Sequence, residues 1–219
     1  MSSESRGCQS RAKRIYNEKM NTTYWVGYTL FKAAAKAFFS YRVENKEKLI
    51  QEGGALIVAN HESFVDPPLI GVAFDEAIYY LARKTLFKGP TTWLYPRWNA
   101  IPVDQENPDM TSLKKIIKLL KSGERVLLFP EGERTLTGEL GPGQPGVGLI
   151  AARAGVPVQP VRIKGAYEAL PRGSGKLRRH PITVTVGDPI EFGKDELKGK
   201  GREAYQKISD KIMGEISKL

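Results

Sequence analysis

The sequence is poor in cysteine and histidine. Cys8 is the single cysteine, so no intramolecular disulfide can form and the chain suits a reducing compartment. The two histidines, His61 and His180, are too few for most histidine-rich metal sites. The residues around His61 also lack the two-histidine spacing of zinc proteases. These counts argue against a disulfide-stabilised fold and a histidine-rich metal centre.

Long apolar runs without charge are missing as well. Residues 1–20 are polar and basic and lack the apolar core that signal peptides contain. We therefore expect a polar basic leader there rather than a signal peptide. Residues 21–41 are rich in aromatics but include Lys32 and Lys36. Each charge at mid-bilayer costs about 2.5–3.5 kcal/mol, which argues against a transmembrane helix. The segment fits an amphipathic helix, lying in a membrane interface or packed on the domain core.

Positive charge is in excess. The chain has 34 Lys and Arg against 24 Asp and Glu, a formal net charge of +10. Such a balance favours an anionic partner: a phosphate-bearing substrate, an acidic lipid surface or nucleic acid. The basic cluster formed by Arg172, Lys176, Arg178 and Arg179 fits a lipid-facing surface or a solvated loop equally well.

From residue 42 onward, apolar runs of strand length alternate with helix-like stretches. This alternation predicts an α/β fold with a mostly parallel central sheet flanked by helices. The expected strands are Ala55–Ala59, Ala77–Leu81, Ile101–Val103, Val126–Phe129, Val156–Val161 and Ile182–Val186. The expected helices between them are Pro67–Phe74, Lys84–Trp93, Ser112–Lys121 and Val147–Ala154. We expect one domain over residues 42–192, with residues 193–219 forming a linker and an amphipathic C-terminal helix packed on it.

A histidine and an aspartate follow the first predicted strand, in Asn60-His61-Glu62-Ser63-Phe64-Val65-Asp66-Pro67. The loop between them is short enough for the Asp66 carboxylate to reach one ring nitrogen of His61. The other nitrogen can then take a proton from a substrate hydroxyl. The alternatives are that Asp66 only caps a helix and that His61 is a structural imidazole. Ser63 as a nucleophile is weaker, because no Gly-x-Ser-x-Gly elbow surrounds it.

A second polar block, Phe129-Pro130-Glu131-Gly132-Glu133-Arg134-Thr135, follows another predicted strand. Arg134 offers a planar fork of donors suited to a phosphate monoester, and Glu131 can orient that arginine or a backbone loop. The alternative is a surface turn with a Glu–Arg pair of little energetic weight. Because ligands of open α/β sheets bind at the ends of strands, the two blocks together predict a general base beside an anion-binding site.

Two further residues lie near predicted strand ends. Lys84 adds positive charge after Ala77–Leu81, although a solvated helix face explains it equally well. Asp104 follows Ile101–Val103 and is ambiguous on its own.

Four ordered blocks carry a family resemblance. Besides the His61 and Arg134 blocks, they are Asn99–Gln105 and Val156–Val161. With these, residues 41–190 resemble the glycerolipid acyltransferases, specifically the 1-acylglycerol-3-phosphate acyltransferases of bacterial phospholipid synthesis. Each block alone is weak, but four in order at compatible spacing are specific.

The resemblance implies roles for these residues. His61 would deprotonate the free hydroxyl of a lysophospholipid and Asp66 would orient it. Arg134, with the turn Glu131-Gly132 and with Thr135, would bind the glycerol phosphate, and Lys84 and Asp104 are further candidates for substrate binding. The acyl donor would be a thioester on coenzyme A or acyl carrier protein, with no metal or prosthetic group. The N-terminal helix would dock at the cytoplasmic face of the membrane, as in a peripheral (monotopic) protein.

Two departures from the family pattern concern the acceptor. Gln105 stands where many members have arginine, and Gly141–Gly146 lacks a lysine often found there. A neighbouring lysine or Arg97 can compensate, or the acceptor differs. Candidate acceptors besides lysophosphatidic acid are another lysophospholipid, glycerol 3-phosphate and a lyso-aminolipid.

Two other classes of protein explain part of the pattern. A non-catalytic basic protein that binds membranes or nucleic acid explains the charge but not the four blocks, and no zinc-finger or RNA-recognition signature supports it. A hydrolase with a serine nucleophile lacks its elbow. The resemblance therefore favours a lipid partner over nucleic acid.

Overall fold

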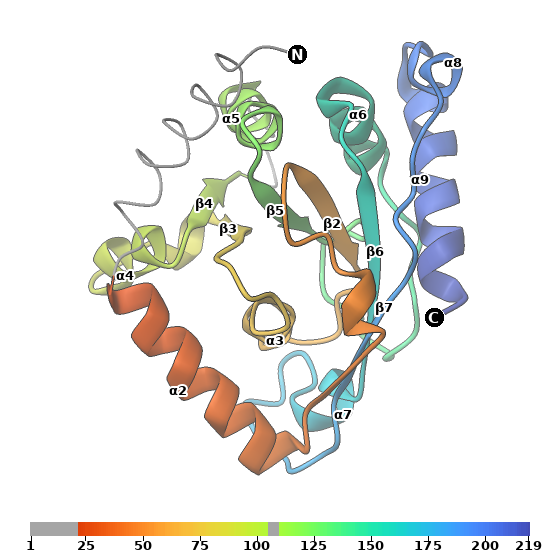
Figure 1. The fold of residues 1–219 in the computed structure, drawn as a ribbon. Helices are drawn as coiled ribbons and strands as arrows, with labels where there is room; N and C mark the ends of the chain where they lie inside the picture. Colours follow the sequence, from red (N-terminus) through yellow and green to blue (C-terminus); the bar gives the residue numbers. More distant parts are fainter. Residues whose placement is uncertain (1–21, 105–109) are drawn as a thin grey trace.

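The computed structural model describes residues 22–104 and 110–219. A seven-stranded sheet lies at its centre, in the order β1-β7-β6-β2-β5-β3-β4 (Figure 1). The strands are β1 (Arg42–Glu44), β2 (Ala55–Ala59), β3 (Tyr79–Arg83), β4 (Ala100–Val103), β5 (Arg125–Leu128), β6 (Val158–Lys164) and β7 (Thr183–Val186). Among these strands, β6 and β7 pair antiparallel and every other pair is parallel. The predicted α/β fold with a mostly parallel sheet is therefore confirmed.

Helices cover both faces of the sheet (Figure 1). On one face, α2 (Thr22–Phe39), α3 (Asp66–Gly71) and α7 (Ala166–Ala169) share a core cluster with the sheet. On the other face, α5 (Met110–Lys121), α6 (Pro145–Ala154) and α9 (Arg202–Ser217) build a second cluster. The shorter elements are the 3-10 helices η1 (Lys46–Lys48) and η2 (Lys84–Leu86) and the α-helices α4 (Thr91–Arg97) and α8 (Lys194–Leu197).

Strand β2 lies at the middle of the sheet and contributes to both cores. All five of its residues are fully buried. Ile57 and Ala59 face the α2, α3 and α7 side, whereas Leu56 and Val58 face the α5, α6 and α9 side. Burial of each large aliphatic side chain stabilises the fold by about 1.5–3 kcal/mol. A continuous apolar run is typical of a parallel strand covered on both faces, so β2 gives the following loop a rigid base.

The structure differs from the predicted elements in several places. Strand β1 and helix α7 were not predicted, because they are too short to show a periodic pattern. The predicted helix Lys84–Trp93 is wrong, since η2 ends at Leu86 and α4 begins at Thr91. Gly89 takes a positive φ of 57° and Pro90 follows it, and this pair interrupts any continuous helix.

One face of α2 packs on the domain. The hydroxyl of Tyr24 lies 3.1 Å from that of Tyr80, and the hydroxyl of Tyr28 donates to the carbonyl of Phe74 at 2.9 Å. Phe39 is buried in the same core cluster. Packing on the core, one of the two alternatives for this segment, is therefore observed.

The opposite face of α2 is exposed and mostly apolar, with Thr29 and Lys36 among its polar members. Val26 is 52 % exposed and Leu30 66 %, and Phe38 lies on the same helix at 38 %. Within residues 22–104 and 110–219, no helix has the length and apolarity needed to cross a bilayer. The helix thus combines a core-packed face with an apolar surface.

Candidate active site

Parallel pairing brings the two polar loops to the same edge of the sheet. In the register of β2 and β5, Val58 pairs with Leu128. His61 and Glu131 each lie three residues beyond this pair, so the two loops leave the sheet at the same level. This edge, at the carboxyl ends of the strands, is where open α/β sheets bind ligands.

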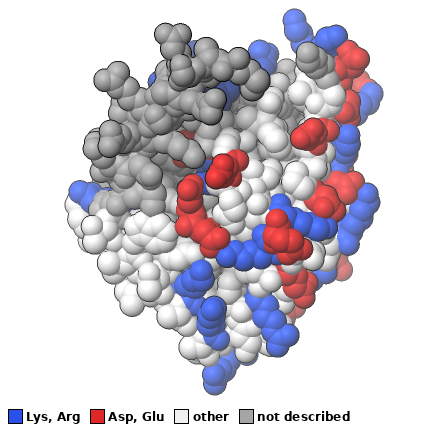
Figure 2. Space-filling view, in the orientation of Figure 1, with Lys and Arg blue, Asp and Glu red and all other residues white. Residues whose placement is uncertain are grey.

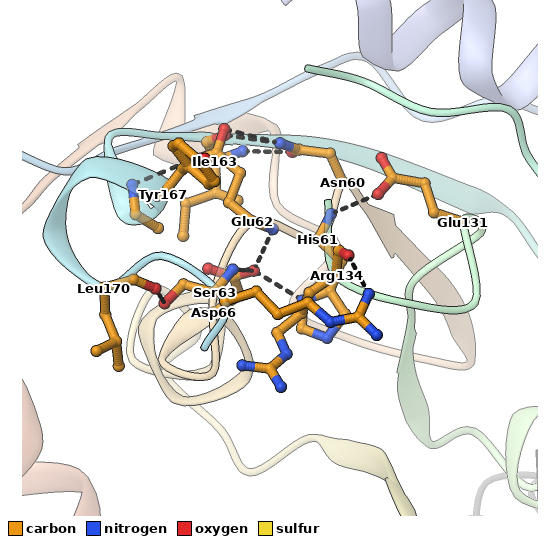
Figure 3. A network of polar contacts seen from close by, with 12 residues as sticks. Asn60, His61, Glu62, Ser63, Asp66, Glu131, Arg134, Ile163, Tyr167 and Leu170 are labelled. Atoms are coloured by element: carbon orange, nitrogen blue, oxygen red, sulfur yellow. Dashed lines mark hydrogen bonds and ion pairs between the residues drawn. The ribbon is translucent and has the colours of Figure 1, made fainter. Parts of the chain in front are cut away.

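The predicted contact between His61 and Asp66 is present (Figure 3). His61 Nδ1 lies 2.8 Å from Asp66 Oδ2. The same carboxylate oxygen accepts the backbone N–H groups of Glu62 at 2.6 Å and of Ser63 at 2.7 Å. Burial raises the pKa of the fully buried Asp66 carboxyl, and the bonds from His61 and the two backbone groups oppose that rise. These three donors all favour an ionised carboxylate that orients the imidazole.

The alternative that Asp66 only caps a helix is wrong. Helix α3 begins at Asp66 itself, Val65 occupies the N-cap position, and no side-chain capping bond forms there. The carboxylate points back toward the preceding loop, where it binds the backbone of residues 62 and 63. The Asp-Pro sequence therefore starts the helix through proline, and the carboxylate serves the loop.

The imidazole of His61 is held on its face and at one nitrogen. Its ring stacks on Phe129 with centroids 3.9 Å apart and planes 15° apart. The side chain is 17 % exposed. Within the part of the chain that the structure describes, Nε2 has no hydrogen-bond partner. The ring thus offers one free nitrogen at its exposed edge.

The second loop holds the backbone of His61 from both sides. Glu131 Oε2 accepts the His61 N–H at 3.4 Å, and the Thr135 N–H donates to the His61 carbonyl at 2.8 Å. Burial raises the pKa of Glu131 to about 7, and its Oε1 is buried without a partner among the described residues. No bond joins Glu131 to Arg134, so of the two predicted roles for Glu131, orienting a backbone loop is the one observed.

The other two predicted site residues of this turn, Gly132 and Thr135, shape its backbone. Gly132 has a φ of 80°, in the left-handed region that glycine adopts without strain. The Thr135 hydroxyl accepts the N–H groups of Thr137 and Gly138 at 3.2 and 3.1 Å. Thr135 therefore closes the turn with its own side chain, and its substrate-binding role stays a prediction.

Arg134 is a partly buried cation whose guanidinium has no bonded partner in the described structure. Burial and the charges of Arg172 and Arg83 lower the pKa of Arg134, while Asp66 opposes that shift. Arg172 Nη1 donates to the Arg134 carbonyl at 3.0 Å and pairs with Glu133 at 2.8 Å. The arrangement leaves the Arg134 guanidinium available to an anion near His61 (Figure 3).

Lys84 and Asp104 face each other, with Lys84 Nζ 3.6 Å from Asp104 Oδ2, and their roles in substrate binding stay a prediction. Arg97 lies over the Trp93 ring at 4.0 Å and donates to the Trp93 carbonyl, and its compensation for Gln105 stays a prediction. Gln105 itself lies outside the described residues, as do Cys8 and the predicted leader.

Comparison with known proteins decides the family. Residues 40–164, more than half of the chain, match the family model described as Acyltransferase. The chain belongs to the acyltransferase family. The match covers both loops of the site, the His61 loop and the Arg134 loop.

Curated acyltransferases of plants and bacteria are similar to this chain. The 1-acyl-sn-glycerol-3-phosphate acyltransferase of Bacillus subtilis (strain 168) is 35 % identical over 153 residues, which cover 68 % of this chain and 73 % of that protein. The chloroplastic 1-acyl-sn-glycerol-3-phosphate acyltransferase BAT2 of Brassica napus is 29 % identical over 182 residues, 78 % of this chain. The matched region spans about half of that plant protein, 53 % of its length.

A solved acyltransferase structure has the same architecture. The 1-acyl-sn-glycerophosphate acyltransferase PlsC from Thermotoga maritima superposes with a TM-score of 0.70 at 25 % identity. The likeness covers 95 % of this chain and 80 % of that one.

Two residues of this acyltransferase site were missed in the sequence. Arg83 ends β3, and its charge acts on Arg134, whereas the prediction named its neighbour Lys84. Glu62 is buried within the His61 loop and was treated only as part of the motif. A basic residue at the carboxyl end of a strand would have indicated Arg83. The strand was predicted to end at Leu81, two residues before Arg83, so this signal was not seen.

Proposed function

We propose that the protein transfers a fatty acyl group from acyl-coenzyme A or acyl carrier protein to the free hydroxyl of 1-acylglycerol 3-phosphate, giving phosphatidic acid. The observation that carries the proposal is the His61–Asp66 pair, with Nε2 unpartnered in the described structure and Arg134 beside it. Relatives named 1-acyl-sn-glycerol-3-phosphate acyltransferase support the choice of acceptor.

The chemistry needs no enzyme nucleophile. His61 Nε2 takes the proton of the acceptor hydroxyl while the hydroxyl oxygen attacks the thioester carbonyl. Asp66 stabilises the imidazolium that forms. The carbon–sulfur bond then breaks, and the imidazolium returns the proton to the thiolate, so that thiol and ester leave together. Base catalysis of this kind contributes about 10²–10⁴-fold.

The geometry argues against Ser63 as a nucleophile. Ser63 is fully buried, and its hydroxyl donates to the Leu170 carbonyl at 2.8 Å. The serine hydrolase alternative therefore has no support in the described site. Family membership likewise leaves a non-catalytic basic protein without support.

The acceptor phosphate is best placed at Arg134, with Arg83 as a second cation. Guanidinium groups bind phosphate in a bidentate manner, and desolvation strengthens such bonds. Burial first, and then repulsion from Arg172 and Arg83, lowers the pKa of Arg134. A dianionic phosphate relieves that repulsion, whereas a neutral head group does not. Acylation of glycerol 3-phosphate, of another lysophospholipid or of a lyso-aminolipid remains the alternative.

An apolar groove beside the site fits lipid tails and a bilayer. It has a volume of about 420 Å³, runs between α2 and the loop ahead of α3, and includes Phe38, Val65 and Leu177 in its lining. Figure 2 shows a largely uncharged surface on the side of α2, with Lys and Arg side chains at the lower tip of the molecule. Basic residues next to an anionic membrane contribute about 1 kcal/mol each. The proposed location is therefore peripheral, at the cytoplasmic face of the membrane.

The proposal is tested by thiol release from a long-chain acyl thioester. Lysophosphatidic acid, glycerol 3-phosphate or no acceptor is added to wild type and to His61→Ala. Release that requires lysophosphatidic acid and is lost in His61→Ala is expected. Release without acceptor would indicate a thioesterase, and release with another acceptor alone would replace the substrate.

A further inference from the structure

The loop that carries His61 is tied to a distant part of the chain. The Asn60 side chain exchanges two hydrogen bonds of 2.8 Å with the backbone of Ile163 at the end of β6. Ser63 bonds the Leu170 carbonyl just after α7. Between these two contacts, Glu62 reaches the start of α7 (Figure 3). The side chains of Asn60, Glu62 and Ser63 therefore anchor the His61 loop to the β6–α7 segment.

Glu62 is surrounded by donors. Its Oε2 accepts the backbone N–H groups of Ala166 at 3.0 Å and Tyr167 at 3.1 Å. Its Oε1 accepts the Asn60 amide at 3.2 Å. The residue is 5 % exposed. Both oxygens are thus used as acceptors, and an ionised carboxylate satisfies all three donors.

The backbone of Glu62 is fixed at the same time. Its N–H donates to Asp66 Oδ2, the oxygen that also contacts the His61 ring. Residue 62 is therefore held between Asp66 on one side and α7 on the other, and His61 is its direct neighbour in the chain. Any shift of Glu62 away from α7 moves the His61 ring relative to Asp66.

We propose that Glu62 is a positioning residue whose ionised carboxylate ties the His61 loop to α7 and keeps the His61 ring in the orientation that takes the substrate proton. The inference rests on the proposed acyl transfer, because it assigns Glu62 a part in that same site. Glu62 itself touches neither the His61 ring nor the Arg134 guanidinium in any bond of the described structure.

Protonation would disturb this tie. Burial raises the pKa of Glu62 to about 7, the charges of Asp66 and Glu168 add to the rise, and the bonds from Tyr167 and Ala166 oppose it. A protonated carboxyl places a donor among three donors, so one bond must break. The tie is therefore complete above about pH 7 and weakens as the pH falls through that value.

The kinetic test compares Glu62→Gln with the matched control Glu168→Gln. Glu168 is an exposed acid on α7 for which no bond to the His61 loop appears in the described structure. Because a glutamine offers one oxygen and places an amide among donors, we expect kcat of Glu62→Gln to fall about 10–100-fold with acceptor KM nearly unchanged. Glu168→Gln should keep the wild-type kcat above about pH 7, where Glu62 is ionised with or without the charge of Glu168. Wild-type kcat in Glu62→Gln would overturn the proposal.

The pH profile separates positioning from a loss of stability. On the acid side, wild-type kcat should include one deprotonation that belongs to Glu62, so its logarithm should fall more steeply, by a slope of about 1, than that of Glu62→Gln as the pH drops below about 7. An equal slope in both proteins would contradict the role of Glu62, even if the variant were less stable.

Hydrogen exchange on the wild-type protein covers the case in which Glu62→Gln does not fold. The amides of Ala166 and Tyr167 should lose protection between about pH 8 and about pH 5.5, after correction for intrinsic exchange. Unchanged protection would refute the tie. Because this measurement needs no turnover, it tests the tie between Glu62 and α7 independently of the proposed acyl transfer. The acyl transfer itself is tested by thiol release with the wild-type protein.

Discussion

Replacing Asp66 by asparagine separates the charge of this residue from its geometry. Asp66 Oδ2 accepts two backbone N–H groups, and only an oxygen fits that position. The asparagine amide nitrogen must then occupy the place of Oδ1, which is buried and has no partner among the described residues. His61 Nδ1 therefore still faces an oxygen in Asp66→Asn, and the ring keeps its proton on Nδ1.

The expected loss in Asp66→Asn is the electrostatic part of the interaction. At about 4 Å and an effective dielectric constant of about 20, a carboxylate stabilises an imidazolium by about 4 kcal/mol. Since about 1.36 kcal/mol corresponds to tenfold in rate, kcat should fall by up to about 10³-fold. The unpaired buried amide should also cost about 1–3 kcal/mol of folding stability.

The assay is acceptor-dependent thiol release by wild type, Asp66→Asn and His61→Ala, with thermal unfolding as the control for folding. Asp66→Asn should retain measurable turnover above that of His61→Ala. Wild-type kcat in Asp66→Asn would show that the charge has no role. A folded Asp66→Asn as inactive as His61→Ala would show that the ring orientation is lost too, against the geometry described above.

Three further outcomes are expected. Arg134→Ala should raise the acceptor KM about 10–100-fold by removing charge-assisted bonds to phosphate. The rise should be larger than in Lys84→Ala, because Lys84 already faces Asp104. A shift confined to the donor KM would place the phosphate elsewhere. Glu131→Gln should be more stable than wild type above about pH 7, by up to about 3 kcal/mol, because the pKa near 7 in the folded protein exceeds the ordinary 4.5. Wild-type stability should therefore fall as the pH rises from about 4.5 to about 7, and chemical unfolding of both proteins at several pH values checks this sign. Leu30→Ser and Phe38→Ser should weaken binding to anionic liposomes. Thermal stability should not fall, because both side chains are exposed. Unchanged liposome binding would show that α2 is not part of the membrane contact.

Much of the fold and the central pair of the site could be predicted from the sequence. The run Ala55–Ala59 is uniformly apolar because β2 is covered on both faces, and this marks both the strand and the loop that follows. The spacing of His61 and Asp66 is local, so their contact follows from a short loop. Arg134 likewise lies in the loop that follows the buried strand β5.

The missed features depend on contacts that are distant in the chain. Glu62 binds residues 166 and 167, more than 100 positions away, and nothing local in the sequence indicates that pairing. Arg83 approaches Arg134 because β3 pairs with β5, and the order of strands in the sheet is not encoded in either strand alone. The N-terminal boundary of β3 was placed two residues early for the same reason, since pairing in the sheet rather than apolar composition sets the strand.

The tyrosine hydroxyls that bind α2 also make this helix a rigid part of the domain. Tyr24 is bonded to Tyr80 on β3, and Tyr28 to the carbonyl of Phe74 after α3, so α2 has no hinge between itself and the sheet over this stretch. A force applied to the exposed face of α2, such as the lateral pressure of a lipid layer, would rotate the whole molecule rather than bend the helix away. The distance and tilt of His61 relative to such a layer would then depend on how α2 is held, by its buried Phe39 as well as by the two phenolic contacts. Loss of either hydroxyl would make that orientation less well defined.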